Sequence, residues 1–270
     1  MSKTVLIVVA HPDPASLNGA LKEIAISELR ELGHRVLLSD LYGMGWKAPF
    51  DGGDFLDRRD PTRLSLVTES GHAYASGTQT PDVMAEQEKL AAADAVIFQF
   101  PLWWFSMPAI LKGWVDRVFA YGLAYGYKNA GNQYRYGDGG FAGKRALLST
   151  TVGGPAIDYS PRGINGPLED LLFHITHGTL FFAGMTVLPT HAIYAVDRLE
   201  REAADDAFMR WRGRLRGLFT DAPIPFRHQN AGDYPDRHVL DESVAPGVRG
   251  FAAHVDTRVH TEGQPRGSET

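Results

Sequence analysis

The sequence predicts an α/β protein with a doubly wound sheet of five parallel strands and helices on both faces. Five runs are nearly continuous in apolar and β-branched residues, which is typical of strands covered on both sides. Segments with helical spacing of apolar residues fall between these runs, and such alternation favours a parallel sheet. The strands are predicted at residues 5–10, 35–41, 95–100, 146–151 and 185–196.

The predicted helices have recognisable starts or apolar stripes. The first spans residues 16–32, with apolar residues at helical spacing and Gly33 as its stop. The second begins at Thr80-Pro81, a cap residue followed by proline in the first turn, and runs to about residue 93. Five strands favour the flavodoxin-like order 2-1-3-4-5 over the longer dinucleotide-binding fold. The remaining helices are predicted at 108–119, 167–182 and 200–219.

Two long irregular segments interrupt the alternation, at residues 43–77 and 122–144. Loops of this length in a compact domain usually act as lids or binding loops. We expect one domain over residues 1–220, followed by an irregular C-terminal extension over residues 221–270. The last stretch of this extension, from residue 257, has the composition of a disordered tail.

Composition excludes several classes of protein. The 270 residues include 27 Lys and Arg against 32 Asp and Glu, so neither nucleic acid nor an anionic membrane surface is an expected partner. Cysteine is absent, which excludes disulfides, thiolate metal sites and a cysteine nucleophile and fits a cytoplasmic protein. No apolar run approaches the ~20 residues of a membrane span. The histidines lack metal-ligand spacing and the G-x-S-x-G motif of hydrolases is missing, so neither a metal site nor a hydrolase is predicted.

The loop after the first predicted strand has the features of an anion site. Free N–H groups at a helix N-terminus bind anions, and Ser16 and Asn18 add side-chain donors. His11 is a further donor for a phosphate oxygen. Neither G-x-G-x-x-G nor the P-loop motif occurs here, so neither of these nucleotide-binding motifs is supported. The alternative is that Ser16 is only a helix cap and His11 only a turn residue.

Aromatic residues follow the third predicted strand, where Trp103, Trp104 and Phe105 lie between two prolines. Three adjacent rings cannot all enter one core face, so at least one is available to a ligand. A strand, an aromatic loop and a helix at the carboxyl edge of a parallel sheet suit a planar aromatic cofactor. The alternative is packing beneath a lid or at a dimer interface.

The fourth predicted strand ends in hydroxyls followed by paired glycines. Thr150 and Thr151 offer hydrogen-bonding groups, and Gly153-Gly154 would let a ligand ring approach the backbone amides. Paired glycines also occur in plain loops. Further side chains able to hydrogen-bond a cofactor or substrate are those of Tyr125, Tyr127, Tyr159 and Asn165.

At these residues the chain resembles the NAD(P)H:quinone oxidoreductase family, the DT-diaphorase type of flavodoxin-like flavoprotein. The resemblance covers roughly the first four fifths of the chain. Its most specific block joins Phe-Pro-Leu-x-Trp-Phe at residues 100–105 to Pro-Ala-Ile-Leu-Lys-Gly-Trp at residues 108–114. It implies FAD rather than FMN, and a homodimer with the site at the subunit interface. It also implies ping-pong hydride transfer from NAD(P)H through FAD N5 to a quinone, with nitro or azo compounds as possible acceptors.

The resemblance also implies a role for individual residues by matching position. Tyr159 and Asn165 are the implied catalytic pair, which would stabilise negative charge on the reduced flavin. The implied FAD-binding residues are His11, Ser16, Leu17 and Asn18 at the phosphates and ribityl chain, Pro101, Leu102, Trp104 and Phe105 along the isoalloxazine, and Thr150, Thr151, Gly153, Gly154 and Tyr159 at its edge. Those implied to close the substrate pocket from the partner subunit are Tyr125, Tyr127 and Phe182.

Two departures from the family pattern stand out. Relatives commonly have histidine where this chain has Asn165, and an amide cannot take up a proton near neutral pH. The residues that contact the adenine end in relatives have no clean counterparts, with Arg198 and Arg201 as nearby candidates. Two other functions stay open: a flavin-bearing ancillary subunit of a potassium-efflux transport system, and a one-electron carrier. The long segment 122–144 favours an enzyme over a carrier.

Overall fold

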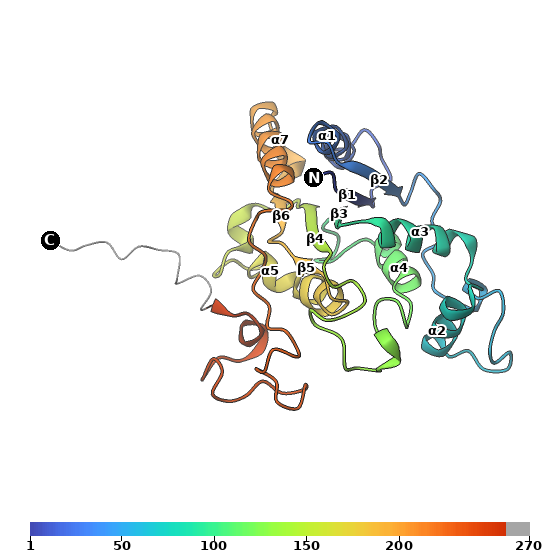
Figure 1. Ribbon diagram of the computed structural model, residues 1–270. Helices are drawn as coiled ribbons and strands as arrows, with labels where there is room; N and C mark the ends of the chain where they lie inside the picture. The colour runs from blue at the N-terminus through green and yellow to red at the C-terminus, as the bar shows by residue number, and fades with distance from the viewer. Residues whose placement is uncertain (258–270) are drawn as a thin grey trace.

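A sheet of parallel strands forms the centre of the structure, a computed structural model in which residues 1–257 are described. The strands follow the order β2-β1-β3-β4-β5, with β6 also beside β4, and every pairing is parallel (Figure 1). The predicted fold class and strand order are confirmed. The strands are β1 (Thr4–Val9), β2 (Arg35–Asp40), β3 (Ala95–Pro101), β4 (Arg145–Thr151), β5 (Thr186–Val187) and β6 (His191–Ile193).

The helices begin largely where the sequence predicts. Ser16 caps α1 by accepting a hydrogen bond from the Gly19 amide at 3.2 Å, and Gly33 follows the helix with a φ of 81°. Pro81 occupies the first turn of α3. The α-helices are α1 (Leu17–Glu31), α2 (Leu66–Ser76), α3 (Pro81–Ala92), α4 (Ala109–Val118), α5 (Leu168–Leu171), α6 (Phe173–Ile175) and α7 (Arg201–Arg216). Short 3-10 turns are η1 (Gly52–Asp54), η2 (Tyr127–Asn129), η3 (Ala156–Tyr159), η5 (Val196–Arg198) and η6 (Gly250–His254).

Each face of the sheet has its own hydrophobic core. Leu6 and Val8 of β1 belong to the core that includes α3 and α4. Val5 and Ile7 belong to the core that includes α1 and α7, which lie side by side (Figure 1). Successive residues of the strand therefore enter opposite cores, which explains why it is apolar throughout.

The prediction of one strand over residues 185–196 is wrong in extent, because two short strands form there. Between them, two residues of β4 face three residues of the partner segment without strand pairing, so the break holds one extra residue. Pro189 lies in this break and has no N–H to continue the ladder. The amide of Thr190 instead donates to the Glu169 carboxylate at 2.8 Å. The sheet consequently has six strands rather than five.

The predicted helix over residues 167–182 forms as three shorter segments: α5, α6 and a π-helical turn η4 (Thr176–Phe181). Leu172, at the first joint, has φ −90° and ψ 3°, outside the helical region. In the π turn, the amide of Phe182 donates to the His177 carbonyl at 2.9 Å, five residues back. Such wide turns are common beside functional sites.

The segment 43–77, predicted as irregular, contains helix α2. Its buried residues include Glu69 and Ser70 rather than a simple apolar stripe. The Glu69 carboxylate accepts from the amides of Arg59 and Asp60 at 2.8 and 3.0 Å. The Ser70 hydroxyl accepts from the amide of Tyr121 at 3.1 Å. Apolar periodicity cannot detect a helix that is held by polar contacts.

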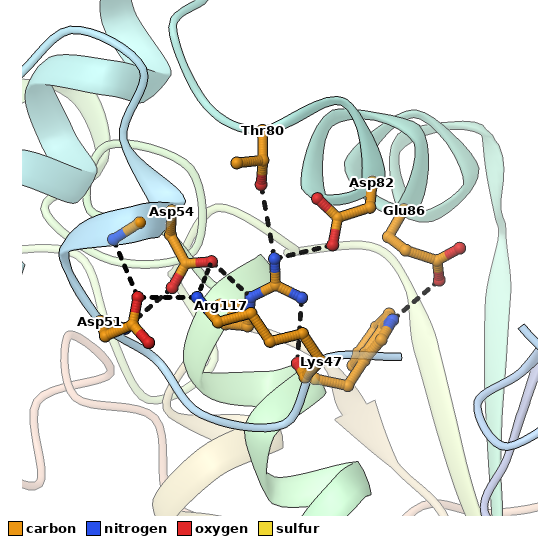
Figure 2. A network of polar contacts seen from close by, with 9 residues as sticks. Lys47, Asp51, Asp54, Thr80, Asp82, Glu86 and Arg117 are labelled. Carbon is orange, nitrogen blue, oxygen red and sulfur yellow. Dashed lines mark hydrogen bonds and ion pairs between the residues drawn. The ribbon is translucent and has the colours of Figure 1, made fainter. Parts of the chain in front are cut away.

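A buried network of ion pairs joins the same segment to α3 and α4 (Figure 2). Arg117 Nε donates to Asp54 at 2.8 Å, and one terminal nitrogen donates to Asp82 at 2.7 Å. The other terminal nitrogen donates to the Lys47 carbonyl at 3.0 Å, while Lys47 Nζ binds Asp54 at 3.2 Å. Each guanidinium nitrogen therefore has an acceptor, and the segment is firmly anchored.

The chain after α7 packs back onto the domain. The amide of Ile224 donates to the Val187 carbonyl at 2.8 Å, and Phe226 forms a β-bridge with Val255. The ring of Phe226 lies 5.1 Å from that of Phe181. The predicted disordered tail lies outside the described residues, except for residue 257. Within the described part of the chain, no helix is long and apolar enough to cross a membrane.

Candidate functional site

Three loops follow the carboxyl ends of β1, β3 and β4, where the chain order along the sheet reverses. They span residues 10–16, 102–108 and 152–167. Open α/β sheets bind their ligands at this switch point. Every predicted cofactor residue lies on one of these loops, in the first turn of α1, or at the ends of β3 and β4.

The β1–α1 loop is held by its own side chains. Ser16 Oγ donates to the Asp13 carbonyl at 2.7 Å, and the Asp13 amide donates to His11 Nδ1 at 3.1 Å. The amides of Leu17 and Asn18 fall in the first helical turn, where no intrahelical acceptor exists. A Cβ on Gly19 would lie 1.9 Å from the Pro14 carbonyl oxygen, so only glycine allows this approach. The loop therefore presents helix N–H groups suited to an anion.

Beneath this loop lies a buried polar cluster that joins α1 to β3 and β4. Asn18 Nδ2 donates to Thr151 Oγ1 at 2.9 Å, and Gln99 Nε2 donates to the Asn18 carbonyl at 2.5 Å. Three buried oxygens of the cluster have no hydrogen-bond partner within residues 1–257: Asn18 Oδ1, Gln99 Oε1 and Ser149 Oγ. Thr150 Oγ1, which faces the opposite side of the sheet, is likewise buried without a partner among these residues. Unpaired buried polar atoms are uncommon and call for an explanation such as a ligand.

The aromatic loop after β3 turns in a strained conformation. The amides and carbonyls of Trp103 and Ser106 hydrogen-bond each other at 3.1 and 3.0 Å. Between them, Trp104 and Phe105 have φ values of 50° and 60°. The left-handed region is unfavourable for bulky residues and is found mainly where function requires it. The Trp104 side chain is 94% exposed, whereas Trp103 and Phe105 are about half as exposed.

One side-chain contact fixes this aromatic turn from outside. Ser106 Oγ lies 3.0 Å from His174 Nε2, and His174 Nδ1 lies 2.9 Å from the Leu171 carbonyl. Because the carbonyl can only accept, Nδ1 carries a proton and donates to it, while Nε2 forms the hydrogen bond with the Ser106 hydroxyl. On the other side, the amide of Leu102 donates to the Thr151 carbonyl at 2.8 Å. Pro101 is the last residue of β3 and pairs with Thr151.

The loop after β4 brings the two predicted catalytic residues together. The side chain of Asn165 lies close enough to the Tyr159 hydroxyl to influence its pKa, and the Asn165 amide donates to the Asp158 carbonyl at 2.9 Å. Burial raises the pKa of the Tyr159 hydroxyl and Asp158 reinforces this, while the Asn165 side chain partly opposes it. A Cβ on Gly154 would lie 3.2 Å from the Tyr159 ring, so glycine permits their close packing.

The three predicted substrate residues lie in two separate aromatic contacts. The ring of Tyr125 lies 6.1 Å from that of Phe182, which Tyr136 also approaches at 5.2 Å. The ring of Tyr127 instead lies 6.4 Å from that of Tyr134. Within residues 1–257, no ring contact joins these two sets to each other or to the three strand-edge loops. Their role at a partner's site stays a prediction.

Sequence reasoning missed Gln99 and Ser149. They pair with each other across β3 and β4, and both are fully or almost fully buried. A signal was present, because each is a polar residue inside an otherwise apolar strand. A single polar residue does not change the overall apolar character by which a buried strand is recognised. In the described part of the chain, no group of three or more histidine or acidic side chains is placed to hold a metal ion.

Comparison with known proteins agrees with this geometry. The flavodoxin-like fold family matches residues 3–216. The ribosyldihydronicotinamide dehydrogenase-like protein traD of Penicillium crustosum is 47% identical over 262 residues, covering 95% of this chain and 97% of that protein. NAD(P)H dehydrogenase [quinone] 1 of Rattus norvegicus is 39% identical over 225 residues, covering 83% and 80%.

A solved structure supports the same relationship. It is a candidate quinone reductase from Klebsiella pneumoniae with a TM-score of 0.90 and 50% identity. The match covers 94% of this chain and 100% of that one. None of these relatives is named for transport, so the ancillary-subunit alternative gains no support. The chain is an oxidoreductase that belongs to the NAD(P)H:quinone oxidoreductase family of flavodoxin-like proteins.

Proposed function

We propose that this enzyme reduces quinones with a reduced nicotinamide donor and uses FAD bound at the carboxyl edge of the sheet. The single observation that carries the proposal is the turn at Trp104 and Phe105. Two bulky residues in the left-handed region, one of them almost fully exposed, are costly without a ligand to cover them. Nitro and azo compounds are further candidate acceptors.

The residues present fit a flavin. The unpaired oxygens of Asn18, Gln99 and Ser149 beneath the loops would find hydrogen-bond donors on the cofactor or on water ordered by it. Gly153 and Gly154 leave the end of β4 without side chains, which suits a flat ring. The first turn of α1, with His11 and Ser16, would hold the phosphates. The Trp104–Phe105 turn, with Pro101 and Leu102, would line the ring system.

The protein residues contribute binding and charge stabilisation. When bound, FAD supplies the two-electron chemistry that links donor to acceptor. The Tyr159 hydroxyl and the Asn165 amide would stabilise negative charge at the cofactor edge through fixed hydrogen bonds. The raised pKa of Tyr159 keeps its proton in place as a donor. Asn165 can donate but cannot store a proton, so Tyr159 is the only titratable member of this pair.

The donor and the acceptor would use one pocket in turn. We infer a homodimer in which Tyr125, Tyr127 and Phe182 of one subunit close the pocket of the other. The rings of Tyr125 and Phe182 already lie 6.1 Å apart, which supports a shared role for these two residues. One pocket for two substrates predicts ping-pong kinetics, with parallel lines in double-reciprocal plots. A cytoplasmic location stays a prediction.

An anaerobic titration tests the proposed function. Purified protein is loaded with FAD and titrated with NADH, with NADPH, or with dihydronicotinamide riboside, because one relative is named for the ribosyl donor. We expect at least one donor to bleach the visible flavin band and menadione to restore it. If none of the three donors bleaches the band, the proposal is wrong.

The substitution Asn165→His tests the catalytic pair. A histidine would add a group that titrates near pH 6.5, so the rate of flavin reduction should acquire a new pH dependence in that region. Stopped-flow absorbance between pH 5 and 8 measures this rate. An unchanged rate and pH profile would place Asn165 outside the reacting centre.

A further inference from the structure

A cavity separate from the strand-edge loops forms where the C-terminal extension packs against segment 122–144 and against the interrupted helix over residues 167–182, called the broken helix below. Its volume is about 330 Å³. This is near the lower end of the roughly 300–1,000 Å³ range of small-molecule sites, so it suits a ligand of one or two rings. None of its lining residues is one of the predicted cofactor or substrate residues. The lining residues that matter here are Arg135, Tyr136, His177, Gln229, Arg237 and His254.

Aromatic rings form one wall of this cavity. Phe251 stacks on Phe173 at 4.3 Å, and Phe173 stacks on His177 at 4.5 Å. His177 in turn stacks on Tyr136 at 4.9 Å. Burial, helped by the neighbouring His254, lowers the pKa of His177 to about 4, so this ring is neutral near pH 7. A neutral row of rings is a suitable contact surface for a planar aromatic ligand.

Unpaired guanidinium groups give the cavity a positive charge. Arg227 is neutralised by Asp233 at 2.7 Å and by Asp256 at 3.3 Å. Arg135 and Arg237, in contrast, have no ion pair with any residue among 1–257. Two free guanidinium groups beside an aromatic wall are suited to a carboxylate, which arginine recognises through parallel hydrogen bonds.

Gln229 adds an acceptor to the same cavity. The residue is 3% exposed, and its Nε2 donates to the Asn132 carbonyl at 3.1 Å. Its Oε1 is buried and has no hydrogen-bond partner within residues 1–257. A ligand hydroxyl would satisfy this oxygen, because an amide carbonyl accepts from a hydroxyl. The cavity thus combines an apolar wall, two cations and one acceptor.

We propose that this cavity binds a planar aromatic acid of one or two rings that carries a hydroxyl beside its carboxylate. The carboxylate pairs with Arg135 and Arg237, the hydroxyl with Gln229, and the ring lies against the aromatic wall. The cavity is built by the C-terminal extension together with segment 122–144 and the broken helix. The proposal does not depend on the quinone chemistry, since it concerns a separate site.

Calorimetric titration of 3-hydroxy-2-naphthoate into the full-length, FAD-loaded protein tests this assignment. We expect saturable binding with one molecule per chain and at least ten-fold weaker binding of the neutral analogue 2-naphthol. Arg135→Gln and Arg237→Gln should each weaken naphthoate binding about ten-fold or more, while the exposed control Arg210→Gln should not change it. Thermal melting of each variant shows that it is folded.

Three results would overturn the proposal. The first is the absence of saturable naphthoate binding. The second is equal binding by the wild type and both cavity variants, or equal binding of the acid and its neutral analogue. The third is complete loss of naphthoate binding in the presence of saturating menadione, which would place the acid in the quinone pocket instead.

Discussion

Two buried polar regions of this protein are built on opposite principles. In the Arg117 network, each guanidinium nitrogen has an acceptor: the carboxylates of Asp54 and Asp82 and the carbonyl of Lys47. At the carboxyl edge of the sheet, Gln99, Ser149 and Thr150 are just as buried, yet each leaves an oxygen without a partner among residues 1–257. Both regions join elements distant in the sequence, so position alone does not explain the difference.

The difference separates buried polar groups that stabilise the fold from buried polar groups that are available to a ligand. A fully paired buried network holds elements together, and losing one partner leaves the other charge stranded. A partly paired cluster destabilises the fold unless a ligand or water supplies the missing hydrogen bonds. The edge of the sheet also carries backbone strain at Trp104 and Phe105, whereas the network is free of it. The unpaired and strained region is therefore where we place the cofactor, and each prediction below probes this division.

The largest expected effect comes from breaking the paired region. Arg117→Met leaves the buried Asp54 without its closest guanidinium contact, and we expect a loss of about 3 kcal/mol in the free energy of unfolding. Urea unfolding of the apoprotein measures it. The control is Lys112→Ala, whose exposed ion pair with Asp116 should be worth less than about 1 kcal/mol. Equal losses in the two variants would contradict the structural role of the network.

The next effect concerns His191, which lies beside Ser149 in the sheet and whose Nε2 has no hydrogen-bond partner in the described part of the chain. Burial, with help from Arg214 and Arg210, lowers its pKa to about 4. The unfolded chain, with a pKa near 6.5, binds the proton more readily, so stability is lost as pH falls from about 6.5 to 4. This amounts to about 3 kcal/mol at pH 4.

Replacing this histidine isolates its contribution. His191→Phe keeps a ring against Trp211, which stacks on the histidine at 4.8 Å, but removes the titrating group. Urea unfolding of both proteins at pH 7 and pH 4.5 should show a smaller loss of stability on acidification in the variant. Equal losses would mean that the protonation of His191 is not linked to unfolding.

The smallest effect compares two adjacent threonines, one paired and one unpaired. Thr151 Oγ1 accepts from Asn18, so Thr151→Val should cost about 1–3 kcal/mol by leaving a buried amide unpaired. Thr150 Oγ1 has no partner within the described chain, so Thr150→Val should leave the stability of the apoprotein unchanged or raise it by about 1 kcal/mol. FAD affinity should fall in both. A destabilised Thr150→Val apoprotein would show that its hydroxyl has a structural role.

Much of the fold and part of the candidate site could be predicted from the sequence, but only where apolar patterning or motifs mark them. The apolar runs located the central strands, and Ser16 with Gly33 marked the limits of α1. The aromatic loop and Gly153-Gly154 were recognisable because exposed rings and paired glycines stand out in a linear sequence. The resemblance to quinone reductases added Tyr159 and Asn165, which the structure brings into contact.

What escaped prediction depends on polar contacts between distant segments. Helix α2 is held by Glu69, whose bonds to backbone amides leave no trace in apolar periodicity. The Arg117 network joins residues up to 70 positions apart, and no local pattern pairs them. The break at Pro189 was visible in principle, but the apolar residues on both sides of it resemble one continuous strand. Left-handed geometry at Trp104 is likewise a property of the folded loop.

The most direct test of the account is FAD binding by Trp104→Gly. Glycine adopts the left-handed conformation without strain, so the free energy of unfolding of the apoprotein should be unchanged or higher by about 1 kcal/mol. The stacking surface is lost at the same time, so titration of FAD into the apoprotein should show at least a ten-fold weaker Kd. The control Met209→Ala, on the exposed face of α7, should bind FAD as the wild type does. If Trp104→Gly binds FAD as tightly as the wild type, the aromatic turn is not part of the cofactor site.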